Sequence, residues 1–286
     1  MYSIMEKSKV IGYVLAAGLC LSGCKPGAVK EVKNDIQFDS TMVSQQYHLL
    51  GNEQYPNCNL QIKFVYPQKA EANVLPMLQK QFVTAYFGEA YDTLAPTQAV
   101  ERYTHDYLEA YKDLEDDFET ELKRADEDTP VGAWYSYYET SSDQIRYNSN
   151  GLLSFTVQFE NYTGGAHGAH AYNHFVLDAT TGERIHEEDI YGEGYQDLLA
   201  EILVHAITRD NDLSDPKELE NIGFFSVDEI YPNNNFYVDD SGITYTFNEY
   251  EVAAYVVGPV HVHLSFDEVH VLLKPDTPIA KLAGKL

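Results

Sequence analysis

Two runs of strand-like sequence meet at a glycine-rich turn near the middle of the chain. The first run, 152–160, alternates apolar and polar residues, and the second run ends at Asp178. Gly164, Gly165 and Gly168 lie between them and reach backbone conformations with positive φ at little cost. This arrangement predicts an antiparallel β-hairpin with a sharp, exposed bend.

Further strand-like runs surround this hairpin. Asn150-Gly151 stands immediately before the first run, and this dipeptide favours a two-residue turn in which both residues have positive φ. Residues 60–66, 243–247 and 260–264 also alternate apolar and polar positions, the period of a half-buried strand. The chain therefore predicts several short strands, and its 23 tyrosines suit the faces of sheets.

Three segments instead carry apolar residues at intervals of three and four, the spacing of a helix with one buried face. These segments are 74–86, 97–122 and 195–209. The middle one bears many carboxylates on its other faces, which we interpret as a solvated surface rather than a cation site. The expected fold class is α+β, with mixed, mainly antiparallel sheets packed on a few helices in two subdomains, 53–146 and 147–286.

The first residues are typical of a lipoprotein signal peptide. The apolar run 10–21 follows two lysines, is too short to span a bilayer, and is followed by two small residues and Cys24. We expect residues 1–23 to be removed and Cys24 to carry a lipid anchor in the cell envelope. Lys25 is not the acidic residue associated with inner-membrane retention, which favours the outer membrane. Residues 24–52 are mostly polar and predict a tether.

The chain is strongly acidic, with a formal net charge of −26 at pH 7. This charge repels nucleic acid and bare anionic lipid, which leaves the lipid at Cys24 as the membrane attachment. A cationic protein would instead be attracted. Cys20 leaves with the signal peptide, so no intrachain disulfide is expected, and Cys58 is interpreted as a small buried strand residue rather than a nucleophile.

Histidines cluster on and after the glycine-rich turn. His167, His170 and His174 would form a metal site if they converged, and His261 and His263 share one face of a later strand. No His-Glu-x-x-His motif or cysteine pair accompanies them. We favour His167 bonding the turn backbone and the other two on an exposed strand face, with no metal and no cofactor. The candidate binding residues are Tyr162, Gly164, Gly165, His167, His170 and His174, and no catalytic residue is assigned.

Signatures of catalysis are otherwise weak. Glu187 and Glu188 are candidates for acid–base chemistry, but adjacent carboxylates are expected in a chain this acidic. The sequence contains neither a Gly-x-Ser-x-Gly motif nor a phosphate-binding loop. Tyr162, Tyr172 and Phe175 near the turn have the chemistry to stack on sugar rings or a partner surface, or to pack as cross-strand pairs.

Two segments together resemble a domain of unknown function found in RsiV-like and PdaC-like envelope proteins. They are Asn161–Gly168 with the following turn 178–182, and Gly242–Gly258. The resemblance covers residue 147 to the C-terminus, and residues 58–159 are similar to the domain that precedes it in those proteins. It implies an α+β fold and an envelope role. The deacetylase activity of PdaC-like proteins lies in a separate catalytic domain, and we find no counterpart of it in this sequence; nor do we find the cytoplasmic segment and spanning helix of the anti-sigma factors.

The expected function is that of a non-catalytic envelope lipoprotein. Its acidic body would bind a cell-surface protein, such as a lysozyme, or a glycan. The alternative is a hydrolase or deacetylase that acts on peptidoglycan or polysaccharide through a histidine-centred site, with or without a metal. The sequence does not distinguish between oligomeric states.

Overall fold

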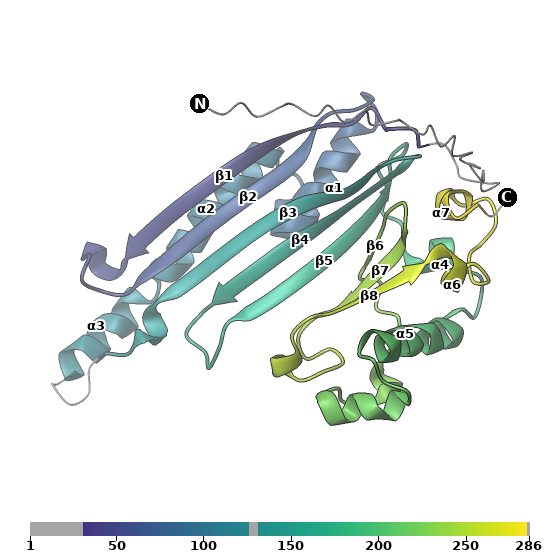
Figure 1. Ribbon diagram of the computed structural model, residues 1–286. Helices are drawn as coiled ribbons and strands as arrows, with labels where there is room; N and C mark the ends of the chain where they lie inside the picture. The colour runs from purple at the N-terminus through teal and green to yellow at the C-terminus, as the bar shows by residue number, and fades with distance from the viewer. Residues whose placement is uncertain (1–30, 126–130, 285–286) are drawn as a thin grey trace, which may run out of the picture.

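The computed structural model describes residues 31–125 and 131–284 (Figure 1). The predicted signal peptide, the predicted lipidation site Cys24 and the start of the predicted tether lie outside these residues. Two sheets and several helices form a mixed α+β fold, as predicted from the alternating runs. Within the described residues, no helix has the length and apolar character needed to cross a membrane.

A five-stranded sheet forms the larger part of the molecule, with its strands in chain order. Neighbouring strands are antiparallel except for the second and third, which are parallel. A parallel pair needs a long crossover, and three helices provide it here. The strands are β1 (Gln37–His48), β2 (Asn57–Lys69), β3 (Tyr137–Ser149), β4 (Leu152–Tyr162) and β5 (Ala169–Asp178).

Helices α1 (Leu75–Phe87) and α2 (Pro96–Lys112) lie against one face of this sheet (Figure 1). The ring of Phe82 on α1 stacks on Phe155 of β4 with the ring centroids 3.9 Å apart. Alternate residues of the strands turn their apolar side chains to this side, as the period of two predicted. The buried core between helices and sheet contains Leu60, Ile62, Phe64, Leu78, Phe82, Val100, Leu153, Phe155 and Val157.

The single helix predicted over 97–122 is wrong, because the chain forms two. After α2 ends, the N–H of Leu114 bonds the carbonyl of Tyr111 at 3.1 Å, and α3 runs over Glu115–Arg124. The break lets Phe118 pack in a second core beside buried Cys58. Three acidic residues fill the first turn of α3, where the helix dipole favours negative charge. The expectation that Cys58 is a buried strand residue is confirmed.

The predicted tether over 24–52 is wrong for its second half, because β1 pairs with β2 along its whole length. β1 is an edge strand whose open side and outer edge both face solvent, so few of its residues need to be apolar. Phe38 and Val43 pack against the main core. The polar composition therefore reflects an edge position rather than a loose segment.

The division predicted at residue 146 is also wrong, since it falls inside β3. The strand runs unbroken through this position, and the five-stranded sheet continues to the end of β5. The turns themselves are confirmed. Asn150 and Gly151 have φ of 55° and 78°, and the N–H of Gly182 bonds the carbonyl of Asp178 at 2.7 Å.

The remainder of the chain forms a smaller sheet beside β5. It comprises β6 (Phe236–Val238), β7 (Gly242–Phe247) and β8 (Val260–Ser265), all antiparallel. The predicted helix at 195–209 is confirmed as α5 (Gln196–Asp210), which buries Leu199, Leu203 and Ile207. Short helices complete this part: α4 (Glu187–Ile190), α6 (Phe266–Val269) and α7 (Pro278–Leu282).

Candidate functional site

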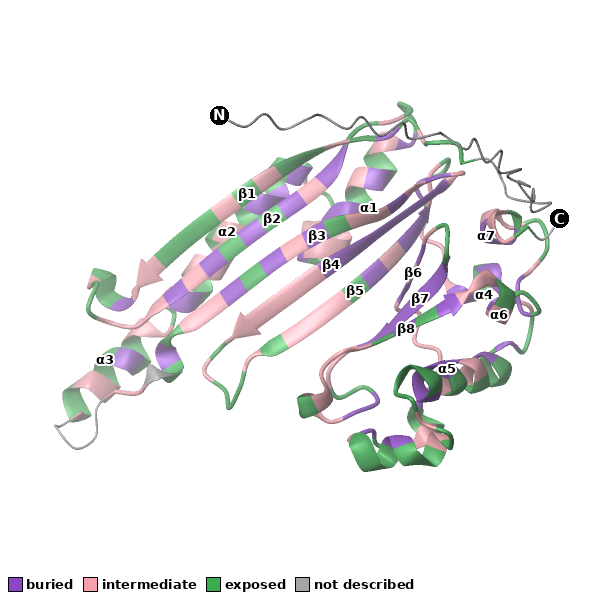
Figure 2. Ribbon diagram, viewed as in Figure 1, coloured by how far each residue is buried: buried purple, intermediate pink, exposed green. Residues whose placement is uncertain are grey.

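The face of the five-stranded sheet opposite the helices is free over much of its area, and we call it the open face. Figure 2 shows the resulting bands of buried and accessible residues along β2 and β3. Strand register aligns the accessible side chains in rows that cross the sheet. One row contains Ser44, Gln61, Thr140, Glu160 and His170, and the next contains Met42, Lys63, Ser142, Gln158 and Tyr172.

The open face is hollowed by two adjoining pockets. One, of about 520 Å³, lies over β1, β2 and β3 and is lined by Met42, Gln61 and Lys63 among others. The second, of about 100 Å³, lies over β3, β4 and β5. Thr140 and Ser142 line both pockets. The two hollows are therefore parts of one groove that crosses the sheet.

The smaller sheet closes one end of this groove. Ser154 and Thr156 point to the open side of β4 but are fully buried, and β6 lies against β4 on this side. The N–H of Val238 on β6 donates to the hydroxyl of Ser154 at 3.3 Å. The groove thus ends at a joint between the two sheets, and its exposed part begins at Gln158 and Tyr172.

The glycines predicted in the turn shape it against a neighbouring segment. Gly164 has φ of 86°, and a Cβ there would lie 2.3 Å from the carbonyl oxygen of Trp134. Tyr162 stacks on Tyr138 with the ring centroids 6.3 Å apart. The hydroxyl of Tyr138 donates to Glu160 at 3.0 Å. Tyr162 therefore lies at the turn end of the open face, whereas Gly164, like Gly165 beside it, belongs to the bend.

His167 bonds the backbone of the turn, as predicted. Its Nδ1 lies 2.8 Å from the carbonyl of Gly168, so Nδ1 carries the proton and donates. Nε2 then accepts from the hydroxyl of Tyr250 at 3.2 Å. The imidazole also stacks on Tyr255, with centroids 4.0 Å apart. Two tyrosines of the C-terminal part therefore hold the exposed His167.

His170 contacts two carboxylates. Its Nδ1 is 2.9 Å from Glu249 Oε1. The backbone N–H of His170 donates to the other oxygen of that carboxylate, Oε2, at 3.2 Å. Its Nε2 lies 3.6 Å from Glu160. The imidazole is 38 % exposed and borders the smaller pocket. Of the three histidines, His170 alone both joins the two sheets and lines the groove.

His174 is 2 % exposed, so the expectation of an exposed strand face is wrong for it. It lies in a hydrogen-bond chain that crosses from β3 to β8. Arg146 Nε donates to Thr156 at 2.9 Å, so the Thr156 hydroxyl donates to His174 Nδ1 at 2.8 Å. His174 Nε2 donates to Thr246 at 2.7 Å, and Thr246 donates to His261 Nδ1 at 2.8 Å. Burial, together with Arg146 and His261, lowers the pKa of His174 to about 3.

The histidines do not converge. Each meets a different partner from the C-terminal part, and His263 bonds Thr244 on its own sheet at 3.1 Å. Residues 31–125 and 131–284 contain no group of three or more His, Cys, Asp or Glu side chains placed to hold a metal ion. The contacts of these histidines show that the turn joins the two sheets.

Two asparagines that we did not predict complete the joint. Asn235 accepts from the N–H of His174 at 2.8 Å and donates to the carbonyl of Tyr172 at 2.8 Å. Asn248 accepts from the N–H of Tyr172 at 2.7 Å. Side-chain amides therefore satisfy the outer edge of β5, where another strand would otherwise pair. The run of asparagines at 233–235 was the available signal.

The acid–base candidate Glu187 has a structural role. It is 2 % exposed, and its carboxylate accepts from the hydroxyl of Tyr195 at 2.9 Å and the N–H of Asn234 at 2.7 Å. Burial raises its pKa. The adjacent Glu188 is exposed. The two carboxylates therefore do not face a common site.

Comparison with known protein families finds two matches along the chain. Residues 188–267 match the family described as a protein of unknown function, DUF3298. Residues 53–170 match the family described as deacetylase PdaC. The second range contains Asn161–Gly168 and the first contains Gly242–Gly258, whereas the turn 178–182 lies between the two ranges. No curated protein matches the chain.

The solved structures that are similar to this chain include two of DUF3298 proteins. The first is a DUF3298 family member from Bacteroides fragilis NCTC 9343, with 31 % identity and a TM-score of 0.82, covering 88 % of this chain and 99 % of that one. The second is a DUF3298 family protein from Pseudomonas aeruginosa PAO1, with 14 % identity and a TM-score of 0.55, covering 86 % of this chain and 96 % of that one. The second likeness concerns the fold alone.

Proposed function

This chain belongs to the DUF3298 family, and we propose that it is a non-catalytic protein of the cell envelope that binds a glycan on the open face of its five-stranded sheet. The groove across this face carries the proposal. Helices cover the opposite face, so the fold leaves this one sheet surface accessible. The predicted residues Tyr162 and His170, both partly exposed, lie at its turn end.

The chemistry of the groove suits an uncharged, polar chain. Its lining includes amides and hydroxyls, among them Gln61, Thr140 and Gln158, which both donate and accept hydrogen bonds as sugar hydroxyls require. Its two charged residues, Lys63 and Glu160, have opposite signs. The aromatic ring of Tyr172 offers a flat apolar surface for a sugar ring. A row of side chains from β2 to β5 spans roughly 14 Å, at about 4.8 Å between strands. This length favours an oligosaccharide over a single sugar.

Binding to peptidoglycan fragments and to acetylated chito-oligosaccharides tests the proposal. We expect Tyr172→Ala and Gln158→Ala to weaken binding at least fivefold, because each removes a contact in the groove. Gln45→Ala is the matched control, since Gln45 is exposed and its partner Leu60 faces the helices. Absence of binding by the unmodified protein, or equal loss in all three variants, would contradict the proposal.

A cationic protein is a second candidate partner, and the net charge of −26 supports it. The exposed carboxylates at the start of α3 contribute to this field. Complementary charge speeds the encounter of such partners and is screened by salt. A pull-down with lysozyme should succeed at low salt and weaken at high salt. Failure at both would remove this candidate.

The hydrolase or deacetylase alternative rests on a histidine-centred site. His167 and His170 are held by different partners, which is why we propose binding without catalysis. The same oligosaccharides, incubated with protein and then analysed by mass spectrometry, should remain intact and acetylated. Turnover that is lost in His167→Ala or His170→Ala would instead support the alternative.

We further propose that a lipid on Cys24 anchors the body to a membrane, with the outer membrane as the favoured location. The apolar run before Cys24 and the small residues beside it support this. Residues 25–36 would then separate the lipid from β1.

A further inference from the structure

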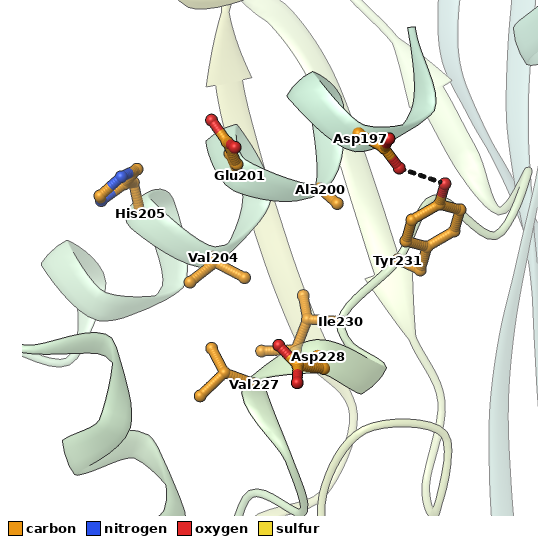
Figure 3. Close-up of a pocket in the computed structure, with 9 residues that line it drawn as sticks. All are labelled: Asp197, Ala200, Glu201, Val204, His205, Val227, Asp228, Ile230 and Tyr231. Carbon is orange, nitrogen blue, oxygen red and sulfur yellow. Dashed lines mark hydrogen bonds between the residues drawn. The ribbon is translucent and has the colours of Figure 1, made fainter. Parts of the chain in front are cut away.

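A separate pocket lies in the C-terminal part of the chain, remote in sequence from every strand of the open face. It has a volume of about 310 Å³ and lies between α5 and the segment 227–231, which includes the 3-10 turn η5 (Val227–Glu229) (Figure 3). This volume is at the lower end of the range for small-ligand sites. Nothing in the proposed glycan binding depends on it.

The pocket exists because α5 has two different faces. One stripe, including Leu199 and Leu203, is fully buried in the core. A second stripe at the same helical spacing faces the short segment 227–231 across the pocket. That stripe consists of Asp197, Ala200, Glu201, Val204 and His205.

The wall of the pocket is apolar. Figure 3 shows Val204 directed from the helix into the gap, with Val227 and Ile230 opposite it. Ile230 is 1 % exposed, so it forms a fixed wall rather than a mobile side chain. The wall suits an alkyl or methylene chain, whose burial is favourable in proportion to the apolar area covered.

The mouth of the pocket is acidic. Asp197 is held in place by the hydroxyl of Tyr231 at 2.9 Å. Glu201 and Asp228 are exposed, and within the part of the chain that the structure describes neither forms an ion pair. Arg209, one turn beyond His205, bonds Asp210 and Glu268 instead. The carboxylates at the mouth therefore lack a cation.

We propose that this pocket binds the alkylammonium group, a primary ammonium on a methylene stem. The stem would lie along Val204, Val227 and Ile230, and the ammonium would sit at the mouth near Asp228, with Glu201 on the helix adding to the negative field. The three carboxylates would repel an anionic ligand. A neutral apolar ligand would gain no electrostatic attraction from them. A free diamine and the lysine side chain of a polypeptide share this chemistry.

Titration followed through backbone amide resonances tests the assignment. We expect n-hexylammonium to shift resonances of 197–205 and 227–231 while those of the open face stay fixed. Hexan-1-ol, which has the stem without the charge, and methylammonium, which has the charge without the stem, should each bind at least fivefold more weakly. Equal binding of hexan-1-ol would overturn the proposal, as would the absence of any shift with n-hexylammonium.

Variants then localise the contact. Glu201→Gln combined with Asp228→Asn should weaken n-hexylammonium binding about tenfold, and raising the salt concentration should weaken it further. Glu220→Gln is the matched control, since Glu220 is exposed on the same part of the chain and does not line the pocket. Equal affinity in the double variant and the control would overturn the assignment. Comparing 1,5-diaminopentane with N-acetyl-lysine methylamide distinguishes the two sources, and tighter binding of either one supports the proposal.

Loss of this binding and loss of glycan binding are distinguishable. The double variant leaves the groove intact, so it should bind oligosaccharides as the unmodified protein does. Tyr172→Ala should conversely retain n-hexylammonium. If each variant lost both ligands, the pocket and the groove would not be separate sites and the proposal would fail.

Discussion

Asp143 is the residue whose environment most departs from that of an ordinary surface carboxylate. It is 6 % exposed on the helix side of β3, and its Oδ1 accepts from the N–H of Val65 at 2.7 Å. Its Oδ2 has no hydrogen-bond partner among the described residues. Burial raises the pKa of Asp143 from 3.8 to about 7. The pairing of β2 with β3 ends at Lys63 and Ser142. Just beyond it, the Asp143 carboxylate takes the place of a backbone carbonyl as the partner of the Val65 N–H.

Because of this raised pKa, Asp143 should make the free energy of unfolding decrease as the pH rises from 4 to 7. Between pH 4 and 7 the folded state holds a proton on Asp143 that the unfolded state has released, so the contribution is present at low pH and lost through pH 7. A tenfold difference in proton affinity corresponds to about 1.4 kcal/mol, so this group contributes roughly 2–4 kcal/mol. Urea unfolding at pH 5 and pH 8 should show this difference, and Asp143→Asn should remove most of it. An unchanged pH slope in the variant would contradict the interpretation.

His174 should act in the opposite direction. Its pKa is lowered from 6.5 to about 3, so the folded state keeps it neutral while the unfolded state binds a proton. Its contribution is therefore present above pH 6.5 and lost as pH falls towards 3. The imidazole resonances of His174 should not titrate between pH 5 and 8. A titration midpoint in that interval would contradict the neutral hydrogen-bond chain to Thr156 and Thr246.

At this scale the sequence predicted the role of His167 and missed that of His174. The glycines around His167 fix a local turn, and a local turn can be derived from neighbouring residues. The burial of His174 depends on β6 and β7, more than sixty residues later, lying over β5. Strand periodicity predicts which side of the sheet a residue faces, but it does not predict which other elements cover that side.

Among the elements, the turns that flank β4 offer a matched comparison between two glycines. Gly151 has φ of 78° and open space where a Cβ would lie, whereas Gly164 has φ of 86° and the Trp134 carbonyl 2.3 Å from that position. Gly151→Ala should cost about 1 kcal/mol of unfolding free energy, from the positive φ alone. Gly164→Ala should cost at least twice as much, because the backbone of residue 134 must move. Equal losses in urea unfolding would show that the close approach is absent.

The strands and helices differ in how well sequence predicted them. Hairpins closed by Asn150-Gly151 or by the turn at 178–182 carry their own signal. The edge strand β1 does not, because one face and one edge are solvated and its polar residues resemble those of a linker. The interruption between α2 and α3 was also hidden, since Leu114 and Phe118 continue the helical spacing across it. Only the second core around Cys58 shows why the chain turns there.

For the whole molecule, the joint between the two sheets explains why the motifs at Asn161–Gly168 and Gly242–Gly258 occur together. The glycine-rich turn supplies His167 and His170, and the segment 242–258 supplies Glu249, Tyr250 and Tyr255, which contact them. The sequence suggested the pair of motifs only through a family resemblance. Their contact depends on the packing of distant elements, which periodicity does not determine.

The proposed anchor makes a separate prediction at this scale. Cys24→Ser should remove the lipid acceptor, so the protein should move from the membrane fraction to the soluble fraction and lack acyl mass on its N-terminal peptide. Cys58→Ser leaves the anchor intact and is the control, although burial of Cys58 makes some loss of stability expected. Membrane association that persists in Cys24→Ser, with no acyl group detected, would contradict lipid anchoring.

Glycan binding on the open face is tested most directly by mapping an acetylated chito-oligosaccharide through backbone amide resonances. Shifts should gather at residues of the groove and fade towards the helices. The residues expected to shift are Gln61, Thr140, Ser142, Gln158, Glu160, His170 and Tyr172. Resonances of α5 and the segment 227–231 should not move. Shifts confined to any other surface, or none at saturating ligand, would contradict glycan binding on this face.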